Sequence, residues 1–291
     1  MSNKFSIAHS FDSVSELVAH ARRVESECGI FENAKIGALD RVPRAWICSD
    51  RPYVNSYKDA LQALEEPRFD AGVDRIERLT EKIVAPAPTS VARKLRRGAE
   101  GDELDLARVW DGELDTAWTM ARRTPVPKAS RVLVVVRVNA MAFIKADVLA
   151  WRGVAALALA DRLEAAGYVV RIAARRLADI RYVNRAYKGT HTVDVTVRKE
   201  GEPLDIHRAA SLIASPLLFR GIMLPMTAFE APARVSPSFS VTSSDGDDVE
   251  APPGFDLVFV ATDRVSDADS ASAFVRHAVA RLEAINTERD A

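Results

Sequence analysis

Arginine and tyrosine side chains gather in one short stretch of the 291-residue chain. The stretch contains Arg175, Arg176, Arg181, Tyr182, Arg185 and Tyr187. Exposed arginine and tyrosine are enriched among the residues that carry most of the binding energy in protein interfaces. We therefore expect residues 175–189 to form a loop that contacts a protein partner. The alternative interpretation is a loop that is only solvated.

A second basic cluster lies earlier in the chain and consists of Arg93, Lys94, Arg96 and Arg97. Together with residues 175–188, it could contact the phosphates of a nucleic acid. No aromatic residue is interleaved with these charges for base stacking, and the whole chain has 40 Lys+Arg against 41 Asp+Glu. We favour a solvated helix face at this cluster and keep nucleic-acid binding as the alternative function.

Motifs of common enzymes are absent from the sequence. It contains no GxxxxGKS/T, GxGxxG, GxSxG or HExxH motif. Five histidines share no ligand spacing: His9, His20, His191, His207 and His277. We therefore expect no metal, no cofactor and no enzymatic activity. An enzyme would instead require a pocket in which Asp194, His191 or Asp263 has a shifted pKa.

Composition also bears on location. Cys28 and Cys48 form no metal-ligand spacing and are interpreted as reduced thiols. No apolar run approaches the roughly 18 to 20 residues that span a bilayer. Residues 1–5 lack the long apolar stretch of a secretory signal. We expect a cytoplasmic protein without a membrane partner.

A strand–helix–strand unit between residues 131 and 174 organises the chain. The apolar run 132–136 is typical of a strand buried on both faces, and the helix over 146–166 is apolar nearly all round. Further strands are predicted at 168–173, 191–198 and 255–260. Strands that alternate with helices predict an α/β fold, with a mainly parallel sheet flanked by helices, as in Rossmann-like domains.

Helices are expected to precede this unit. Amphipathic patterns predict helices at 14–26, 56–65 and 72–83, and the prolines at 86 and 88 end this series. We predict a helical N-terminal region over 1–88, a charged connecting segment over 89–130 and an α/β domain over 131–291. A short strand is expected at 45–48. A short helix at 106–110 should dock on the main domain through Trp110 and Trp118.

Polar residues follow two of the predicted strands. Arg137 and Asn139 come after the first strand, and Thr262 and Asp263 come after the last. Ligands of open α/β sheets bind outside the carboxyl ends of the strands. We therefore expect these four residues to line a strand-end pocket.

The strand at 132–138, the helix from Trp151 and the segment 258–263 resemble a von Willebrand factor A-type domain, over about residues 131–285. The arrangement is also similar to uncharacterised phage and prophage proteins. In the von Willebrand family, an Asp-x-Ser-x-Ser turn and a later Asp hold a divalent metal that binds partner proteins. Arg137 stands at the first Asp position here, so the resemblance implies a domain without its metal. We expect Arg137 to pair with Asp263 instead.

These observations favour a non-enzymatic adaptor or structural protein, encoded by a phage or prophage, that binds a protein partner through its strand-end face and the Arg/Tyr-rich stretch. The alternative is a nucleic-acid-associated protein. An enzyme with an unrecognised site is the third possibility.

Overall fold

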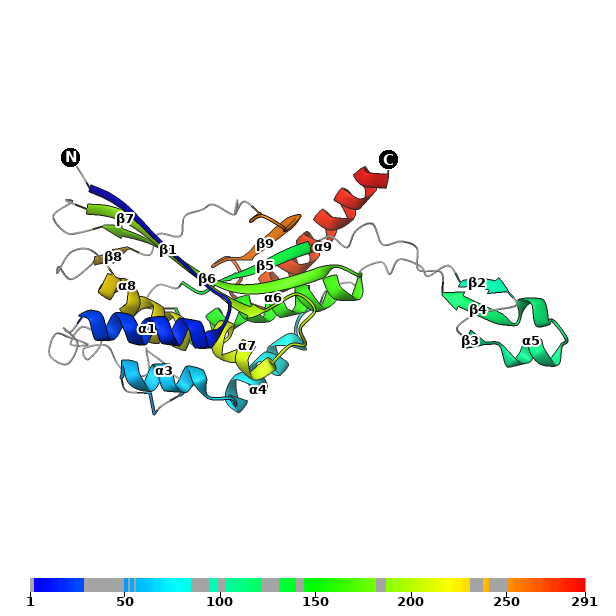
Figure 1. The fold of residues 1–291 in the computed structure, drawn as a ribbon, viewed down its shortest axis with the longest axis horizontal. Coiled ribbons are helices and arrows are strands. Elements are labelled where there is room, and N and C mark those ends of the chain that lie inside the picture. The colour runs from blue at the N-terminus through cyan, green and yellow to red at the C-terminus, as the bar shows by residue number, and fades with distance from the viewer. Residues whose placement is uncertain are drawn as a thin grey trace.

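The computed structural model describes residues 3–28, 50–51, 53–54, 56–84, 95–98, 103–121, 131–139, 144–181, 187–230, 238–240 and 251–290. Within these residues, a six-stranded sheet lies at the centre of the molecule (Figure 1). Its strands run in the order β1-β7-β6-β5-β9, and β8 pairs with β6. The bounds are β1 Asn3–Phe11, β5 Arg131–Arg137, β6 Val169–Arg181, β7 Tyr187–Arg198, β8 Ser238–Ser240 and β9 Leu257–Ala261.

Parallel pairing dominates this mixed sheet. β5 pairs in parallel with both β6 and β9, and β1 pairs in parallel with β7. The exceptions are the antiparallel pairs that β6 makes with β7 and β8. The predicted α/β class with a mainly parallel sheet is therefore confirmed, and all four predicted strands are present.

The described residues of the Arg/Tyr-rich stretch lie in the two antiparallel strands of a hairpin, so the loop predicted over 175–189 is wrong for these residues. β6 continues to Arg181, and β7 already begins at Tyr187. Burial alternates residue by residue from 169 to 178, which is the period of a strand. Four of the five buried positions between 170 and 178 carry apolar residues, and Arg176 occupies the fifth, so the inner face of the strand continues through the arginines.

Helices pack on the sheet and on one another. The central helix α6 packs on β5, β6 and β9, and α9 packs on α6. Their bounds are α1 Val14–Cys28, α3 Tyr57–Glu65, α4 Asp70–Thr80, α6 Ala146–Ala165, α7 Ile206–Ile213, α8 Leu224–Glu230 and α9 Ala268–Asp290, with a π-helical turn η3 at Leu217–Met223. Among the described residues, no single helix is long and apolar enough to cross a membrane; α7 and the stretch 217–227 pass that test together, but a 62° bend separates them.

The N-terminal region shares the core of the sheet. The helices predicted at 14–26, 56–65 and 72–83 are confirmed as α1, α3 and α4, and their apolar faces join the same hydrophobic cluster as β5 and α6. Strand β1, which sequence patterns did not predict, adds the N-terminus to the sheet edge beside β7. The predicted strand at 45–48 lies outside the described residues.

A small separate unit comes from the connecting segment. Strand β4 (Trp118–Ala121) pairs antiparallel with β2 (Leu95–Gly98) and β3 (Glu103–Leu104), next to helix α5 (Leu106–Trp110) and the short turn η2 (Leu114–Thr116). Figure 1 shows this unit, which we call the projecting module, apart from the main sheet. The predicted short helix is confirmed, but its docking through Trp110 is wrong, because the Trp110 side chain is 86% exposed.

Candidate functional site

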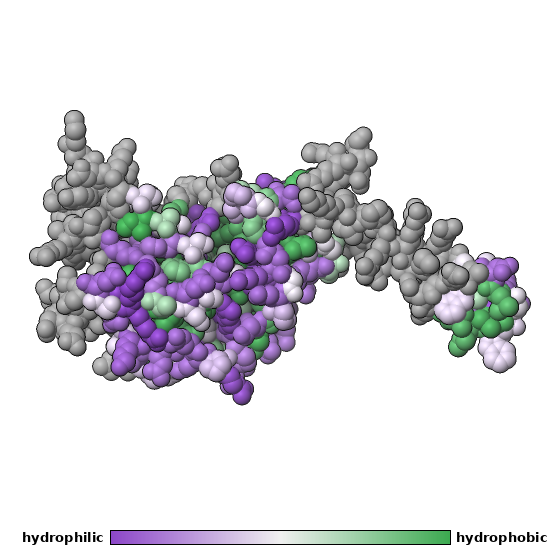
Figure 2. Space-filling view, in the orientation of Figure 1, coloured by the Kyte–Doolittle hydropathy of each residue, from purple (hydrophilic) through white to green (hydrophobic). Residues whose placement is uncertain are grey.

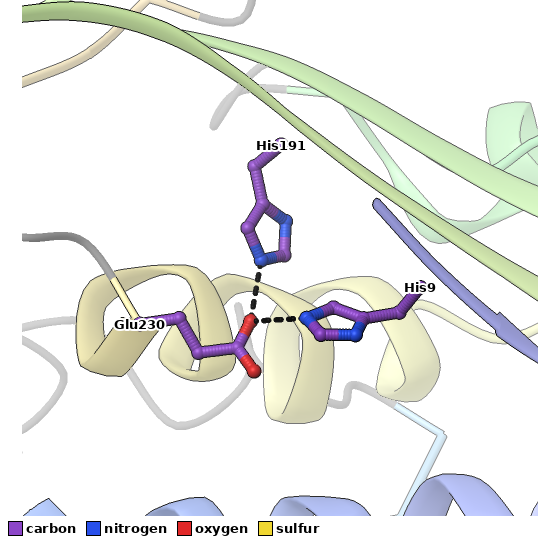
Figure 3. Close-up of side chains that lie close together, drawn as sticks. All are labelled: His9, His191 and Glu230. Carbon is purple, nitrogen blue, oxygen red and sulfur yellow. Dashed lines mark hydrogen bonds and ion pairs between the residues drawn. The ribbon is translucent and has the colours of Figure 1, made fainter. Parts of the chain in front are cut away.

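A carboxylate at the end of α8 lies among three histidine side chains. Glu230 Oε2 lies 3.0 Å from His9 Nε2 and 2.6 Å from His191 Nε2. The other oxygen, Oε1, lies 2.6 Å from His20 Nε2. Figure 3 shows the rings of His9 and His191 directed at the same oxygen. We call these four residues the His–Glu cluster.

Four elements position the His–Glu cluster. His191 on β7 lies opposite Ile7 on β1, so His9, two residues further along β1, shares the same face of the sheet. α1 carries His20, and α8 carries Glu230 and packs on α1. The side chain of His191 is fully buried, whereas that of His9 is 23% exposed. The cluster is therefore closed on the β7 side and open to solvent at His9.

A buried arginine lies behind His191. The side chain of Arg176 on β6 is fully buried, and its Nη1 atom lies 3.2 Å from His191 Nδ1. The same nitrogen donates a hydrogen bond to the Thr227 hydroxyl, which in turn donates to the Met223 carbonyl oxygen at 2.8 Å. Thr227 Oγ1 also lies 3.3 Å from His191 Nδ1. Arg176 and Thr227 thus form a second layer around the imidazole.

The electrostatics of the cluster favour an ionised Glu230 and a neutral His191. Burial lowers the pKa of His191 and outweighs its hydrogen bond to Glu230, and the charge of Arg176 lowers this pKa further. Burial alone would raise the pKa of Glu230, but hydrogen bonds from His191 and His20 lower it to about 2. Burial also lowers the pKa of Arg176, to about 9.

The arrangement supports two kinds of chemistry. An ionised carboxylate only accepts hydrogen bonds, so without a cation each histidine Nε2–H group can donate to Glu230. Alternatively, the ligand atoms of His9, His191 and Glu230 all lie within 4.8 Å of one another, close enough to share a cation. Sequence spacing concealed this group, because His9 and Glu230 are 221 residues apart.

The structure separates the residues of the Arg/Tyr-rich stretch. Arg175 makes a two-pronged ion pair with Asp194 on β7, at 2.6 and 2.7 Å. Arg176 is buried, so its predicted contact with a partner is wrong. Arg181 and Tyr187 end β6 and begin β7. Tyr182 and Arg185 lie outside the described residues.

The strand-end residues are mainly buried. Arg137, Asn139 and Thr262 have exposures of 6%, 6% and 5%, whereas Asp263 is exposed. Asn139 bonds both the N–H and the carbonyl oxygen of Leu177, which fixes the end of β5 against β6. The pairing of Arg137 with Asp263 stays a prediction.

Sequence patterns missed the residue that organises this strand end, Arg152 on α6. Its Nη1 donates to the carbonyl oxygens of Arg137 at 3.0 Å and of Asn139 at 2.5 Å. Burial lowers the pKa of Arg152 to about 10, and the negative charge of Asp263 opposes this shift. The guanidinium therefore satisfies buried backbone groups where β5 ends. The signal in the sequence was an arginine within an apolar helix, because a buried charge needs hydrogen-bond partners.

The described part of the basic cluster at 93–97 is a strand, so the expected helix face is wrong for these residues. Arg96 and Arg97 lie in β2, opposite Met120 and Thr119 of β4. Arg93 and Lys94 lie outside the described residues.

Comparisons with known proteins give one result. A family model described as a domain of unknown function, DUF7192, matches residues 6–282. No curated protein and no solved structure matches the chain. The match runs through both expected boundaries, at 88 and 130.

Proposed function

The chain belongs to the DUF7192 family, and we propose that it is a non-enzymatic, cytoplasmic interaction protein that binds a protein partner through its projecting module. The observation that carries this proposal is the exposure of apolar side chains on the module. Leu106 is 62% exposed, Trp110 is 86% exposed and Leu114 is 61% exposed. Figure 2 shows hydrophobic colour gathered at that end of the molecule.

The concentration of these side chains distinguishes them from ordinary surface residues. Single exposed apolar residues are normal on proteins, but a contiguous group is typical of an interaction surface. With Leu104, four of the seven large hydrophobic residues that are exposed in the described part of the chain lie between 104 and 114. Tryptophan is also among the residues most enriched at the centres of interfaces.

Charges around the apolar face define the partner. The module carries five acidic residues between 103 and 121, against Arg108 in the same stretch and Arg96 and Arg97 in β2. Arg108 is already paired with Asp105 and Glu113, at 3.6 and 2.7 Å. Asp111 and Asp115 are exposed and take no part in these two ion pairs. We infer a partner with an apolar pocket and a basic rim.

We also infer that the α/β part is a von Willebrand factor A-like domain without its metal, encoded by a phage or prophage, as the resemblance implies. Two observations support the loss of the metal. Arg137 is buried where the family has an Asp, and Asn139 uses its amide on the backbone of Leu177. One carboxylate beside a guanidinium cannot supply the oxygen-rich, negative site that such cations require.

Substitution of the module tests the proposed function. The full-length protein, tagged and expressed in its native host, should capture a partner, and Trp110→Ala should reduce that capture at least tenfold without lowering the Tm. Leu204→Ala is the matched control, because Leu204 is exposed on the main body. Equal capture by wild type and Trp110→Ala would reject the module as the binding surface.

Two double variants test the other proposed binding surfaces. Arg96→Ala with Arg97→Ala removes charges proposed for nucleic-acid contact, and Arg181→Ala with Arg185→Ala tests the Arg/Tyr-rich stretch. We expect no DNA binding at low salt by the wild type. Binding that falls steeply with salt and with the first pair would favour the nucleic-acid function instead.

A further inference from the structure

We propose that His9, His191 and Glu230 bind one divalent transition-metal ion of the zinc class. This site is separate from the projecting module and goes beyond the proposed interaction function. One ligand atom from each residue lies within 4.8 Å of the other two. The contacts of Glu230 Oε2 with His9 Nε2 and His191 Nε2 identify these three atoms as the ligands.

The spacing of these atoms suits a small cation. Ligands held at about 2.0–2.1 Å from a tetrahedral ion lie roughly 3.3 Å apart. The contacts of Glu230 Oε2 with the two imidazole nitrogens are 3.0 and 2.6 Å. To admit the ion, the contact with His9 must therefore lengthen by about 0.3 Å and the contact with His191 by about 0.7 Å. His20 holds the other oxygen of Glu230 at 2.6 Å, which leaves Oε2 to face the ion.

The second layer can orient His191 as a ligand. A metal-bound imidazole coordinates through an unprotonated nitrogen and donates its other N–H to an acceptor. Thr227 Oγ1 lies 3.3 Å from His191 Nδ1 and gives its own proton to the Met223 carbonyl oxygen. The hydroxyl oxygen can therefore accept from Nδ1–H, and this tautomer frees Nε2. Arg176 Nη1 lies 3.2 Å from His191 Nδ1 and can only donate, so metal binding requires its N–H to turn from Nδ1 to the Thr227 hydroxyl, which it already contacts.

The donor set selects the class of metal. Two imidazole nitrogens and one carboxylate oxygen suit Zn²⁺, Co²⁺ and Ni²⁺, whereas Ca²⁺ and Mg²⁺ require more oxygen ligands. The positive charge of Arg176 repels a bound cation. Glu230 is the carboxylate that interacts with Arg176, and it would have to balance both positive charges. We therefore expect weaker binding than in closed four-ligand zinc sites.

Titration of the untagged full-length protein tests this site. After treatment with a chelator and its removal, ZnCl2 should bind at one equivalent in calorimetry and raise the Tm, and CoCl2 should give the visible absorption of a nitrogen-ligated ion. MgCl2 should do neither. His9→Ala and Glu230→Gln should each weaken zinc binding at least tenfold. His277→Ala is the control, because His277 is exposed on α9.

Two results would overturn the proposal. The first is no zinc binding at one equivalent by the wild type, which would leave a purely hydrogen-bonded cluster. The second is zinc binding that survives both cluster substitutions, or that His277→Ala removes equally. If Glu230→Gln fails to fold, His9→Ala decides, because the ring of His9 is partly exposed and its loss is easier to accommodate.

Discussion

His191 Nδ1 lies 3.2 Å from a guanidinium nitrogen of Arg176, and both side chains are fully buried. A proton added at Nδ1 would place two positive charges side by side without water to screen them. The imidazole is therefore held neutral between the guanidinium and Glu230. Protonation of His191 would therefore disturb the contacts that join β7 to β6 and α8.

The stability of the metal-free protein should fall on acidification. Because the pKa of His191 is lowered below its ordinary 6.5, its contribution is complete above pH 6.5 and is lost as the pH falls. The pKa of Glu230 is lowered from 4.5 to about 2, so its contribution is lost between those values. Denaturant titrations in chelator at several pH values should show both losses. Replacement of His191 by Gln should remove the first loss, and a stability that is flat from pH 7.5 to 5 would contradict this assignment.

Substitution of Gly153 should destabilise the protein although alanine is the better helix former. A Cβ atom at position 153 would lie 2.4 Å from the backbone carbonyl oxygen of Ile213, where α6 meets α7. The helix propensity gained is about 1 kcal/mol, but the overlap with rigid backbone must be relieved. We expect Gly153→Ala to lower the free energy of unfolding by about 2 kcal/mol. Asp161→Ala on the exposed side of the same helix is the control. If Gly153→Ala leaves the free energy of unfolding unchanged, α6 and α7 can move apart without cost and the prediction is wrong.

Replacement of Arg152 by Met should cost about 3 kcal/mol in the free energy of unfolding. The variant removes hydrogen bonds to two buried carbonyl oxygens, those of Arg137 and Asn139. Arg162→Met provides a comparison, because Arg162 lies nearly three turns later on α6 and donates to the carbonyl oxygen of Ala158 within the helix. Equal losses for both variants would mean that Arg152 has no special role at the strand end.

The ion pair between Arg175 and Asp194 should contribute little. Both side chains are partly exposed, at 20% and 24%, and solvent screens such pairs. A double-mutant cycle with Arg175→Ala and Asp194→Ala should give a coupling of up to about 1 kcal/mol. A much larger coupling would indicate that the surface of the hairpin is covered in solution.

The sequence allowed the central part of the fold to be predicted, because its signals are local. The continuous apolar run of β5 and the apolar helix α6 require burial on several sides, wherever the rest of the chain lies. β1 was missed although Phe5, Ile7, His9 and Phe11 alternate with smaller or polar residues. The polar His9 interrupts the alternation of apolar residues that would mark a buried strand face.

The His–Glu cluster could not be predicted, because it depends on long-range pairing. His9 and His191 meet only through the register of β1 on β7, and Glu230 reaches them from the end of a helix whose position the sheet decides. Arg176 was assigned to a partner surface because arginine is usually exposed. The alternation of β6 places it inside instead.

Photo-crosslinking in the native host can show whether the projecting module contacts a partner protein. A photoreactive amino acid is placed at position 110 on the projecting module, and in a separate protein at position 204 on the main body. We expect a specific protein adduct from position 110 that is absent from position 204 and is reduced when Leu106 is also replaced by Ser. No adduct at position 110, or the same adducts from both positions, would contradict the claim that the module binds a partner.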